Sequence, residues 1–279
     1  MPTVVAVSGP EGAERVITLA DSGGWERRTH VERVWGTVVT FDIRAESFPT
    51  DYDEVLGTAV RFLHEVDAWF STYRADSSIT MLRNGLQPGF LMPRVVTEVL
   101  EECRAVRRLT GGVFDPWAVR GGVDPSGYVK GWAAGQVADQ LVRAGLRNVC
   151  VNAAGDIACR GEQAPGETWA IGILDPDDTQ QIVHVVRVRD GAVATSGLYE
   201  RGRHVIDPRD GSTRVHYDQA TIVGPEAGLA DALATAALIA GPSCVAWFAG
   251  MTQWSAYLVK DRVASSFGPA FADAAPEHG

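Results

Sequence analysis

Lysine is scarce in this 279-residue chain, in which only Lys130 and Lys260 among 25 basic residues are lysines. The formal net charge of −10 argues against non-specific binding to nucleic acid or to an anionic membrane, because both need a basic surface. An anionic ligand would therefore need positive charge supplied locally, by a lysine or by a metal ion. The four cysteines are far apart in the sequence and include no Cys-x-x-Cys pair, so we expect them to be reduced core residues.

Long apolar runs are also missing. No stretch approaches the eighteen apolar residues of a membrane-spanning helix, and residues 1–16 lack the basic and apolar regions of a signal peptide. With 46% apolar and 22% charged residues, the composition is that of an ordinary globular protein. We therefore expect a cytoplasmic protein with no membrane anchor.

Several familiar site motifs are absent as well. The glycine pairs do not follow the Walker A or Gly-x-Gly-x-x-Gly patterns, no Gly-x-Ser-x-Gly elbow occurs, and the histidines lack zinc-ligand spacing. The chain therefore carries none of the usual signatures of a P-loop, a Rossmann nucleotide site, a serine hydrolase of that type or a structural zinc site.

The patterns that are present alternate between helices and short strands, which predicts an α+β fold with a mostly antiparallel sheet. We expect residues 1–30 to be an N-terminal extension, residues 31–268 to form the main domain and residues 269–279 to be a flexible tail. A Thr50/Asp53 capping box is expected at the start of the first helix, which ends at Phe70. Later helices are predicted over residues 93–110, 130–144 and 229–239 and from 242; strands are predicted over 34–43, 148–152, 168–173, 182–188, 192–195, 204–211, 219–223, 254–260 and 262–266.

The stretch Asp124–Ala133 combines a carboxylate, a glycine-containing turn and a lysine at the expected start of a helix. A helix N-terminus carries free N–H groups and the positive end of the helix dipole, so a phosphate could bind there, and Lys130 would add a full charge. The alternative is an ordinary junction between an extended segment and a helix, since single glycine-rich turns are weak motifs.

A polar turn at Ser71–Ser78 also allows two interpretations. Its hydroxyl groups could bind a ligand, or its serine and aspartate side chains could cap a short helix near residues 79–84.

The alanine-rich helix at 229–239 carries Asp231 and Thr235 four residues apart, so both side chains lie on one helix face. A carboxylate and a hydroxyl are costly to bury unless both are bonded, and an oxygen-ligated cation would satisfy them. Alternatively, Asp231 is a first-turn acid and the Thr235 hydroxyl bonds to the preceding helical turn.

Seven blocks follow one another across residues 34 to about 250: Trp35–Thr37, Phe70–Tyr73, Gly111–Pro116, Asp124–Ala133, Ala194–Gly197, His204–Gly211 and Ala230–Thr235. In this order and spacing they resemble the ApbE-type FAD:protein FMN transferases. The resemblance implies an α+β architecture of T-fold-like halves with FAD bound between them. It also implies Mg²⁺-dependent transfer of FMN from FAD to a Ser/Thr hydroxyl of an acceptor protein, with release of AMP.

Carried over residue by residue, the resemblance implies a magnesium site made by the side chains of Asp231 and Thr235 and the backbone carbonyl of Gly127. Lys130 and Asp231 would serve catalysis by neutralising phosphate charge, and His204 would orient the acceptor or move a proton. Asp124 and Lys130 would face FAD. The other implied FAD contacts are Trp35, Tyr73, Val113, Phe114, Asp115 and the Val205 backbone.

The chain departs from the family pattern at a few points. Trp35 stands where the family often has methionine, and Ala153-Ala154 stands where paired glycines are common. No lipoprotein signal is evident, whereas many relatives are exported and anchored, so the acceptor is expected inside the cell or on the cytoplasmic side. Two other functions stay open: a Mg²⁺-dependent FAD pyrophosphatase that forms FMN and AMP, and a noncatalytic FAD-binding protein.

Overall fold

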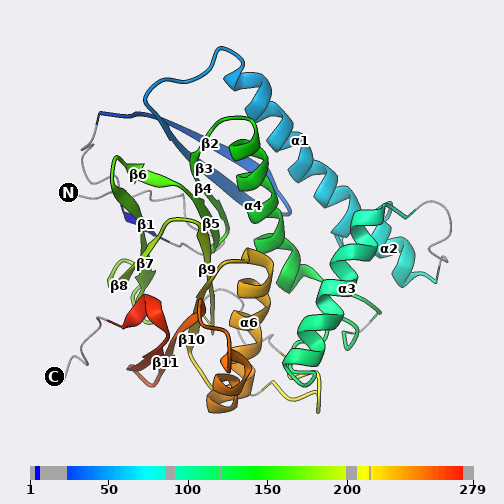
Figure 1. Ribbon diagram of the computed structural model, residues 1–279. Helices are drawn as coiled ribbons and strands as arrows, with labels where there is room; N and C mark the ends of the chain where they lie inside the picture. Colours follow the sequence, from blue (N-terminus) through cyan, green and yellow to red (C-terminus); the bar gives the residue numbers. More distant parts are fainter. Residues whose placement is uncertain are drawn as a thin grey trace.

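Two β-sheets and a layer of helices build the computed structural model (Figure 1), which describes residues 4–6, 24–85, 92–119, 121–198, 206–213 and 215–272. Within these residues, the larger sheet has eight strands in the order β12-β11-β10-β9-β5-β4-β3-β2, and every neighbouring pair is antiparallel. Its strands are β2 (Glu26–Val34), β3 (Thr37–Ala45), β4 (Asn148–Ala153), β5 (Asp156–Arg160), β9 (Gly191–Gly197), β10 (Gln219–Gly224), β11 (Ser255–Lys260) and β12 (Val263–Phe267).

A smaller sheet packs against one face of the larger one. In it β7 pairs in parallel with β1 and antiparallel with β6 and β8. Its strands are β1 (Val4–Ala6), β6 (Glu162–Ala164), β7 (Glu167–Leu174) and β8 (Ile182–Val188). The predicted α+β class with mostly antiparallel sheet is therefore confirmed.

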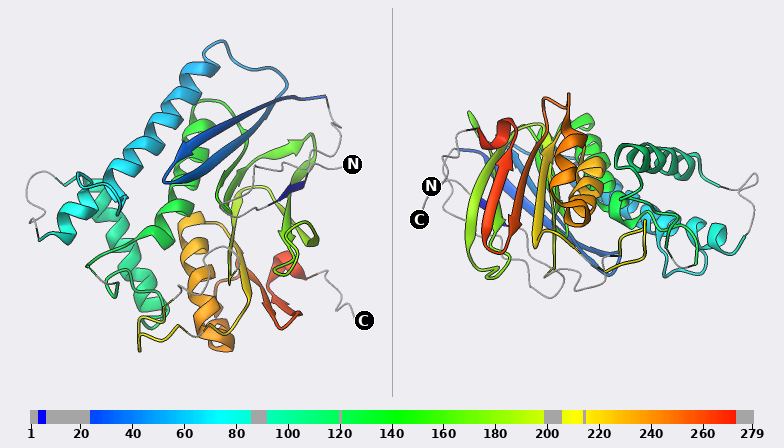
Figure 2. Two further views of the ribbon diagram at one scale, coloured as in Figure 1. Left: turned by 180° about the vertical axis from the view of Figure 1, so that it is seen from behind. Right: turned by 90° about the horizontal axis from the view of Figure 1, so that it is seen from below.

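The helices are α1 (Tyr52–Phe70), α2 (Ser78–Arg83), α3 (Arg94–Leu109), α4 (Ser126–Arg143) and α6 (Ala227–Ala240), followed by the 3-10 helices η2 (Gly241–Phe248) and η3 (Pro269–Phe271). Helices α4 and α6 cover the face of the larger sheet opposite the smaller one, whereas η3 packs against β8, β11 and β12. Helix α4 packs on β4 and β5, α6 packs on β9 and β10, and α1 lies against α4. Seen from below, the strands gather on one side of the molecule and the helices on the other (Figure 2).

The fold has one hydrophobic core under the helices and a second one between the two sheets. Successive side chains along the central strands point into these two cores in turn, as the two-residue period of a strand requires. On β4, Val149 and Val151 belong to the core under the helices, whereas Cys150 belongs to the core between the two sheets. On β5, Ala158 faces the helices, and Cys159 faces the smaller sheet beside Cys150. All four cysteines are buried free thiols, which confirms the prediction from their spacing.

The segment Ala227–Phe248 is long and apolar enough for a membrane span, with a mean hydropathy of 1.6. More than half of it is buried inside the fold, where α6 packs on α4 and the sheet. A buried core helix meets the same length and composition criteria, so this segment is explained by packing.

Several local predictions need correction. Trp35 does not lie in a strand: with Gly36 it forms the left-handed tip of the β2–β3 hairpin, at φ values of 58° and 72°. The Thr50/Asp53 capping box does not form, because Asp51 occupies the N-cap of α1 and makes no side-chain cap. Of the strand and closing turn predicted over 204–211, the turn is found at 208–210, residues 206 and 207 are not in a strand, and residues 204 and 205 lie outside the described residues.

The ends of the main domain also differ from the expected boundaries. Strand β2 begins at Glu26 and runs through the boundary expected at residue 30, and Val4–Ala6 pairs with β7. At the other end, Phe271 is buried in the core between the sheets, so the fold continues past residue 268. The packed part of the chain is therefore longer at both ends than the sequence pattern indicated.

Candidate functional site

The close approach of α4 and α6 brings the main candidate residues together. A side-chain carbon added at Gly131 on α4 would lie 2.3 Å from the Ala227 carbonyl oxygen of α6, and one added at Gly228 would lie 2.8 Å from the Tyr128 ring. Only glycine fits at such backbone contacts, so these two positions let the helix axes come close. As a result Lys130 and Asp231, far apart in the sequence, face each other across the helix pair.

A buried charge cluster occupies this crossing. The Lys130 ammonium makes a short ion pair with Asp156 Oδ2 and lies 3.2 Å from Asp231 Oδ2. Asp231 is 1% exposed and Asp156 is 3% exposed, so both carboxylates are out of contact with bulk water. The trio of Lys130, Asp156 and Asp231 carries one net negative charge, and burying an excess charge is costly unless a cation joins it.

One carboxylate oxygen in the trio lacks a partner. Asp231 Oδ2 accepts hydrogen bonds from the Lys130 ammonium and, at 3.4 Å, from the backbone N–H of Gly131. Asp231 Oδ1 is buried without a hydrogen-bond partner among the residues that the structure describes. An unsatisfied buried oxygen of this kind calls for an explanation such as a bound ion, and its negative charge favours a cation.

The other two predicted magnesium ligands lie beside this oxygen-rich face of α6. Thr235 follows Asp231 by one helical turn, and its hydroxyl lies 3.1 Å from the Ser196 hydroxyl on β9. A side-chain carbon at Gly127 would lie 3.8 Å from Thr235 Oγ1, so the first turn of α4 reaches the same place. The structure therefore brings Gly127, Asp231 and Thr235 together.

The chemistry of the available donors suits a hard divalent cation. Within the described part of the chain, no group of three or more His, Cys, Asp or Glu side chains could hold a metal ion, so a cation here would depend on hydroxyl and carbonyl oxygens as well. Burial, with a smaller contribution from Asp231, raises the pKa of the nearby Cys103 thiol to about 12. That thiol stays neutral at physiological pH, and oxygen ligands without thiolate are the set that Mg²⁺ prefers.

The start of α4 differs from the prediction. The helix begins at Ser126, four residues before Lys130, so Lys130 points into the helix pair from the second turn. Asp124 Oδ1 accepts a hydrogen bond from the Ser126 N–H at 3.0 Å, which fixes the turn into the helix. For Asp124, the ordinary junction role is therefore observed.

The turn after α3 is held by a short chain of polar contacts. The Thr110 hydroxyl donates to the Val106 carbonyl and accepts the Phe114 N–H at 3.1 Å. Val113 and Phe114 are buried, and a side-chain carbon at Gly127 would lie 3.5 Å from the Phe114 ring. This predicted nucleotide-lining turn therefore packs directly against the first turn of α4.

Asp115 ends the same turn and is bound on both carboxylate oxygens. Arg107 Nε donates to Asp115 Oδ2 at 2.5 Å, and the Trp117 N–H donates to Asp115 Oδ1 at 2.9 Å. Arg107 and the Trp117 backbone therefore fix the orientation of the Asp115 side chain.

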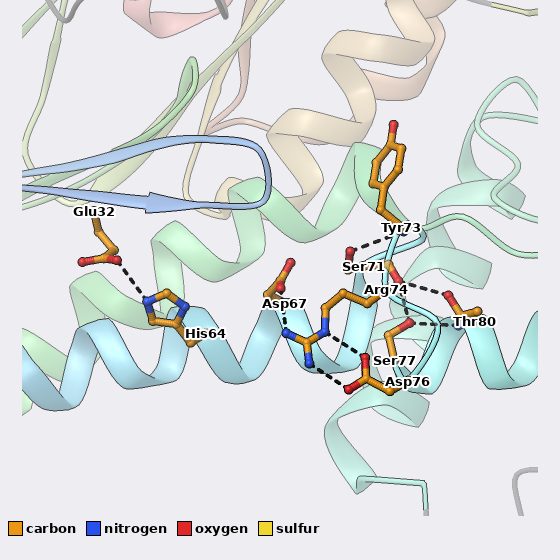
Figure 3. Close-up of polar contacts among 9 residues, drawn as sticks. All are labelled: Glu32, His64, Asp67, Ser71, Tyr73, Arg74, Asp76, Ser77 and Thr80. Carbon is orange, nitrogen blue, oxygen red and sulfur yellow. Dashed lines mark hydrogen bonds and ion pairs between the residues drawn. The ribbon is translucent and has the colours of Figure 1, made fainter.

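Tyr73 is presented to solvent by a rigid polar loop (Figure 3). Its side chain is 97% exposed and points away from the Arg74–Asp76 ion pair. The Arg74 guanidinium binds both oxygens of Asp76, at 2.9 and 3.1 Å, and also Asp67 at the end of α1, at 3.3 Å. An exposed aromatic ring on a fixed loop can stack against a planar ligand with little loss of conformational entropy.

Ser77 and Thr80 complete the loop from the side of α2. Ser77 Oγ accepts the Thr80 N–H at 3.0 Å and donates to the Ser71 carbonyl at 2.5 Å, and the Thr80 hydroxyl donates to the same carbonyl at 3.3 Å. The capping interpretation of this polar turn is therefore confirmed for Ser77.

Three predicted site residues, Trp35, His204 and Val205, come from outside these elements. Trp35, at the hairpin tip, is partly buried, and its indole N–H lacks a hydrogen-bond partner within the described residues. It is thus a free donor at a predicted FAD contact. His204 and Val205 lie outside the described residues.

Asp156 and Ser196 are site residues that the sequence patterns did not single out. Asp156 follows the Ala153–Gly155 turn, and Ser196 lies inside the Ala194–Gly197 block, so both stood in stretches already noted for other reasons. Their contacts join strands to helices across long sequence separations, and no local spacing encodes such contacts.

The fold is α+β, and a buried cluster of charged and hydroxyl side chains lies where two of its helices cross. A model of the ApbE family matches residues 117–258, just over half of the chain, and the chain belongs to this family. The matched segment contains the charge cluster and all three predicted cation ligands, whereas Trp35, Tyr73 and the 113–115 turn precede it.

Comparisons with individual proteins agree with this assignment. The chain is 28% identical over 243 residues to the FAD:protein FMN transferase of Vibrio cholerae, an alignment that covers 65% of this chain and 72% of that protein. It is 29% identical over 148 residues to the Haemophilus influenzae FAD:protein FMN transferase, covering 49% of this chain and 43% of that relative.

Solved structures match over a larger part of the chain. The flavin transferase ApbE of Vibrio cholerae superposes with a TM-score of 0.77 at 22% identity, covering 88% of this chain and 98% of that one. The ApbE protein of Thermotoga maritima gives 0.74 at 20% identity, covering 86% and 96%. These likenesses establish the fold.

Proposed function

We propose that this chain is an FAD:protein FMN transferase that uses Mg²⁺ and transfers FMN to a Ser/Thr hydroxyl of an acceptor protein. The observation that carries the proposal is the buried Asp231 Oδ1, which has no partner among the described residues and belongs to the same helix face as Thr235, one turn away. The first turn of α4 at Gly127 approaches Thr235, and all three residues lie inside the segment that matches the ApbE family. The names of the relatives support the reaction, and the unpartnered Asp231 oxygen supports the proposal that a cation takes part in it.

The proposed reaction is a phosphoryl-type transfer. The acceptor hydroxyl attacks the FMN-side phosphorus of FAD, a P–O bond to the other phosphate breaks, AMP leaves, and the hydroxyl proton passes to a base. His204 is the proposed base or orienting residue. Such a reaction is catalysed mainly by neutralising charge on phosphate oxygens rather than by covalent chemistry.

The residues of this chain would divide the work as follows. Asp231, Thr235 and the Gly127 carbonyl would hold Mg²⁺, which supplies a Lewis acid for phosphate oxygens when bound. Lys130 would bring an ammonium group to the phosphates from a partly buried place, where electrostatic interactions are stronger than in water. Tyr73 and Trp35 offer an exposed ring and a free indole N–H for the ring systems of FAD.

A direct test is incubation of the protein with FAD, Mg²⁺ and candidate acceptor proteins, followed by mass measurement of protein and nucleotide products. We expect the acceptor to gain one FMN with loss of water and AMP to appear in equal amount. Free FMN and AMP with an unmodified acceptor would indicate a pyrophosphatase instead. FAD that stays intact in the presence of several acceptors would contradict both activities and favour a binding protein.

The loop that presents Tyr73 gives a separate prediction. Arg74→Ala removes the guanidinium that joins the loop to Asp67 and Asp76, and the ring would then be held less firmly in position. We expect KM for FAD to rise about five- to tenfold, because loss of fixed orientation is felt directly in binding. The melting temperature should hardly change, since exposed ion pairs contribute little to stability.

Arg94→Ala is the matched control, since it removes an exposed arginine paired with Glu98 at 2.6 Å on α3. It should leave KM for FAD unchanged. Equal KM values for the two variants would contradict a positioning role for Arg74.

A further inference from the structure

Of the two carboxylates paired with the Lys130 ammonium, that of Asp156 is the nearer, and the reaction proposed above gives it no role. It begins β5, where it pairs with Ala153 of β4 and Ala194 of β9, so its carboxylate lies on the sheet face covered by α4 and α6. The Lys130 ammonium lies closer to Asp156 Oδ2 than to Asp231 Oδ2, which is 3.2 Å away. Lys130 is thus shared between two buried carboxylates, and Asp156 holds it more closely.

This sharing matters for cation binding at Asp231. An ammonium ion and a divalent cation compete for the same carboxylate, because each is stabilised by the same negative charge. With Asp156 present, the trio carries one formal net negative charge and Lys130 is shared between two carboxylates. Without the Asp156 charge, Lys130 and Asp231 would form a formally neutral pair, and Asp231 would attract a cation less strongly.

We propose that Asp156 is a positioning residue that draws the Lys130 ammonium onto its own carboxylate, so that Lys130 contacts Asp231 only through Oδ2 and leaves Oδ1 available to the cation. The inference rests on the proposed cation site, and it adds a residue that acts through Lys130 rather than on FAD. Loss of a residue that supports a metal ligand from outside typically weakens metal affinity by about 10- to 100-fold.

Asp156→Asn tests this by removing the charge while keeping nearly the same shape. Mn²⁺ serves as a probe for Mg²⁺. Its affinity for the site is measured by electron paramagnetic resonance, and competition with Mg²⁺ shows that both ions bind there; neither measurement needs turnover. We expect Mn²⁺ affinity to fall at least about tenfold, equivalent to about 1.4 kcal/mol.

The double variant Lys130→Met/Asp156→Asn separates positioning from direct ligation. It removes both members of the ion pair and restores one net negative charge at Asp231, so Mn²⁺ affinity should return to about the wild-type value. Lys130→Met alone should bind Mn²⁺ more tightly than wild type, because two carboxylates then face the ion without a competing ammonium. A double variant that binds as weakly as Asp156→Asn would overturn the proposal, since Asp156 would then be a ligand or a purely structural residue.

Asp42→Asn is the matched control, because Asp42 is another buried carboxylate paired with cations, Arg44 at 2.6 Å and Arg27 at 2.9 Å. It should leave Mn²⁺ affinity unchanged. If Asp156→Asn does not fold, Lys130→Met still decides the matter, and unchanged or weaker Mn²⁺ binding by that variant contradicts the proposal. Failure of the wild-type protein to bind Mn²⁺ would instead refute the proposed cation site itself.

Discussion

Asp231→Ala is expected to lower the rate of FMN transfer about a thousandfold while the fold survives. The substitution removes the buried carboxylate whose Oδ1 has no partner in the described structure, and with it the one charged ligand proposed for Mg²⁺. A thousandfold loss corresponds to about 4 kcal/mol of transition-state stabilisation, which is a usual effect for a group that neutralises phosphate charge. The rate should be measured at saturating FAD and Mg²⁺.

The thermal stability of Asp231→Ala should not fall with its activity. In metal-free buffer the wild-type trio carries one formal net negative charge, whereas Asp231→Ala leaves Lys130 paired with Asp156 and no formal net charge on the pair. We therefore expect the variant to melt at the same temperature as wild type or higher in EDTA. Addition of Mg²⁺ should raise the melting temperature of the wild-type protein alone, because a ligand stabilises only the state that binds it.

Asp139→Ala is a suitable control, since it removes a carboxylate of α4 that pairs with Arg160 at 2.7 Å at the other end of the helix. It should retain both transfer and the Mg²⁺-dependent increase in melting temperature. Undiminished flavinylation of an acceptor by Asp231→Ala would rule out the assignment of Asp231 as a ligand.

The second large effect is expected for Gly131→Ala. The added methyl group would lie 2.3 Å from the carbonyl oxygen and 2.8 Å from the carbonyl carbon of Ala227, and 3.0 Å from Asp231 Cβ. Backbone atoms of a packed helix cannot move aside singly, so α4 and α6 must separate. Overpacking of this kind costs about 3 kcal/mol, which would be visible as a lower urea midpoint.

Gly135→Ala, one turn further along α4, provides a matched comparison. Its added carbon would lie 3.6 Å from Ala227 Cβ, an ordinary contact, and alanine favours a helix over glycine by about 1 kcal/mol. This variant should be as stable as wild type or more so. Equal midpoints for the two alanine variants would show that the contact at Gly131 does not set the helix spacing.

The parts of the site that were predictable from the residues alone are local. Asp231 and Thr235 are four residues apart in an apolar helix, and helical geometry places them on one face whatever the rest of the chain does. The contacts that complete the site are not local. Lys130 meets Asp156 and Asp231 only because glycines allow α4 and α6 to approach, and only the ordered blocks of family resemblance connected these segments beforehand.

The failures of sequence reasoning have equally specific causes. Trp35 lies within a run of β-branched and aromatic residues, so composition predicted a strand, whereas the hairpin places this tryptophan at φ 58°. The start of α4 was expected near Lys130, but the Asp124 side chain fixes the turn and allows the helix to begin at Ser126. In both places a tertiary or side-chain contact decided a boundary that local propensity left open.

The first and last described segments share one side of the molecule, because β1 pairs with β7 and Phe271 packs in the core between the two sheets. The proposed site lies across the larger sheet, under the helices (Figure 1). A linker attached at the described segments Val4–Ala6 or Pro269–Phe271 would therefore lie on the opposite side of the larger sheet from the proposed site. Immobilised protein should then accept bulky acceptor substrates as readily as the free enzyme does.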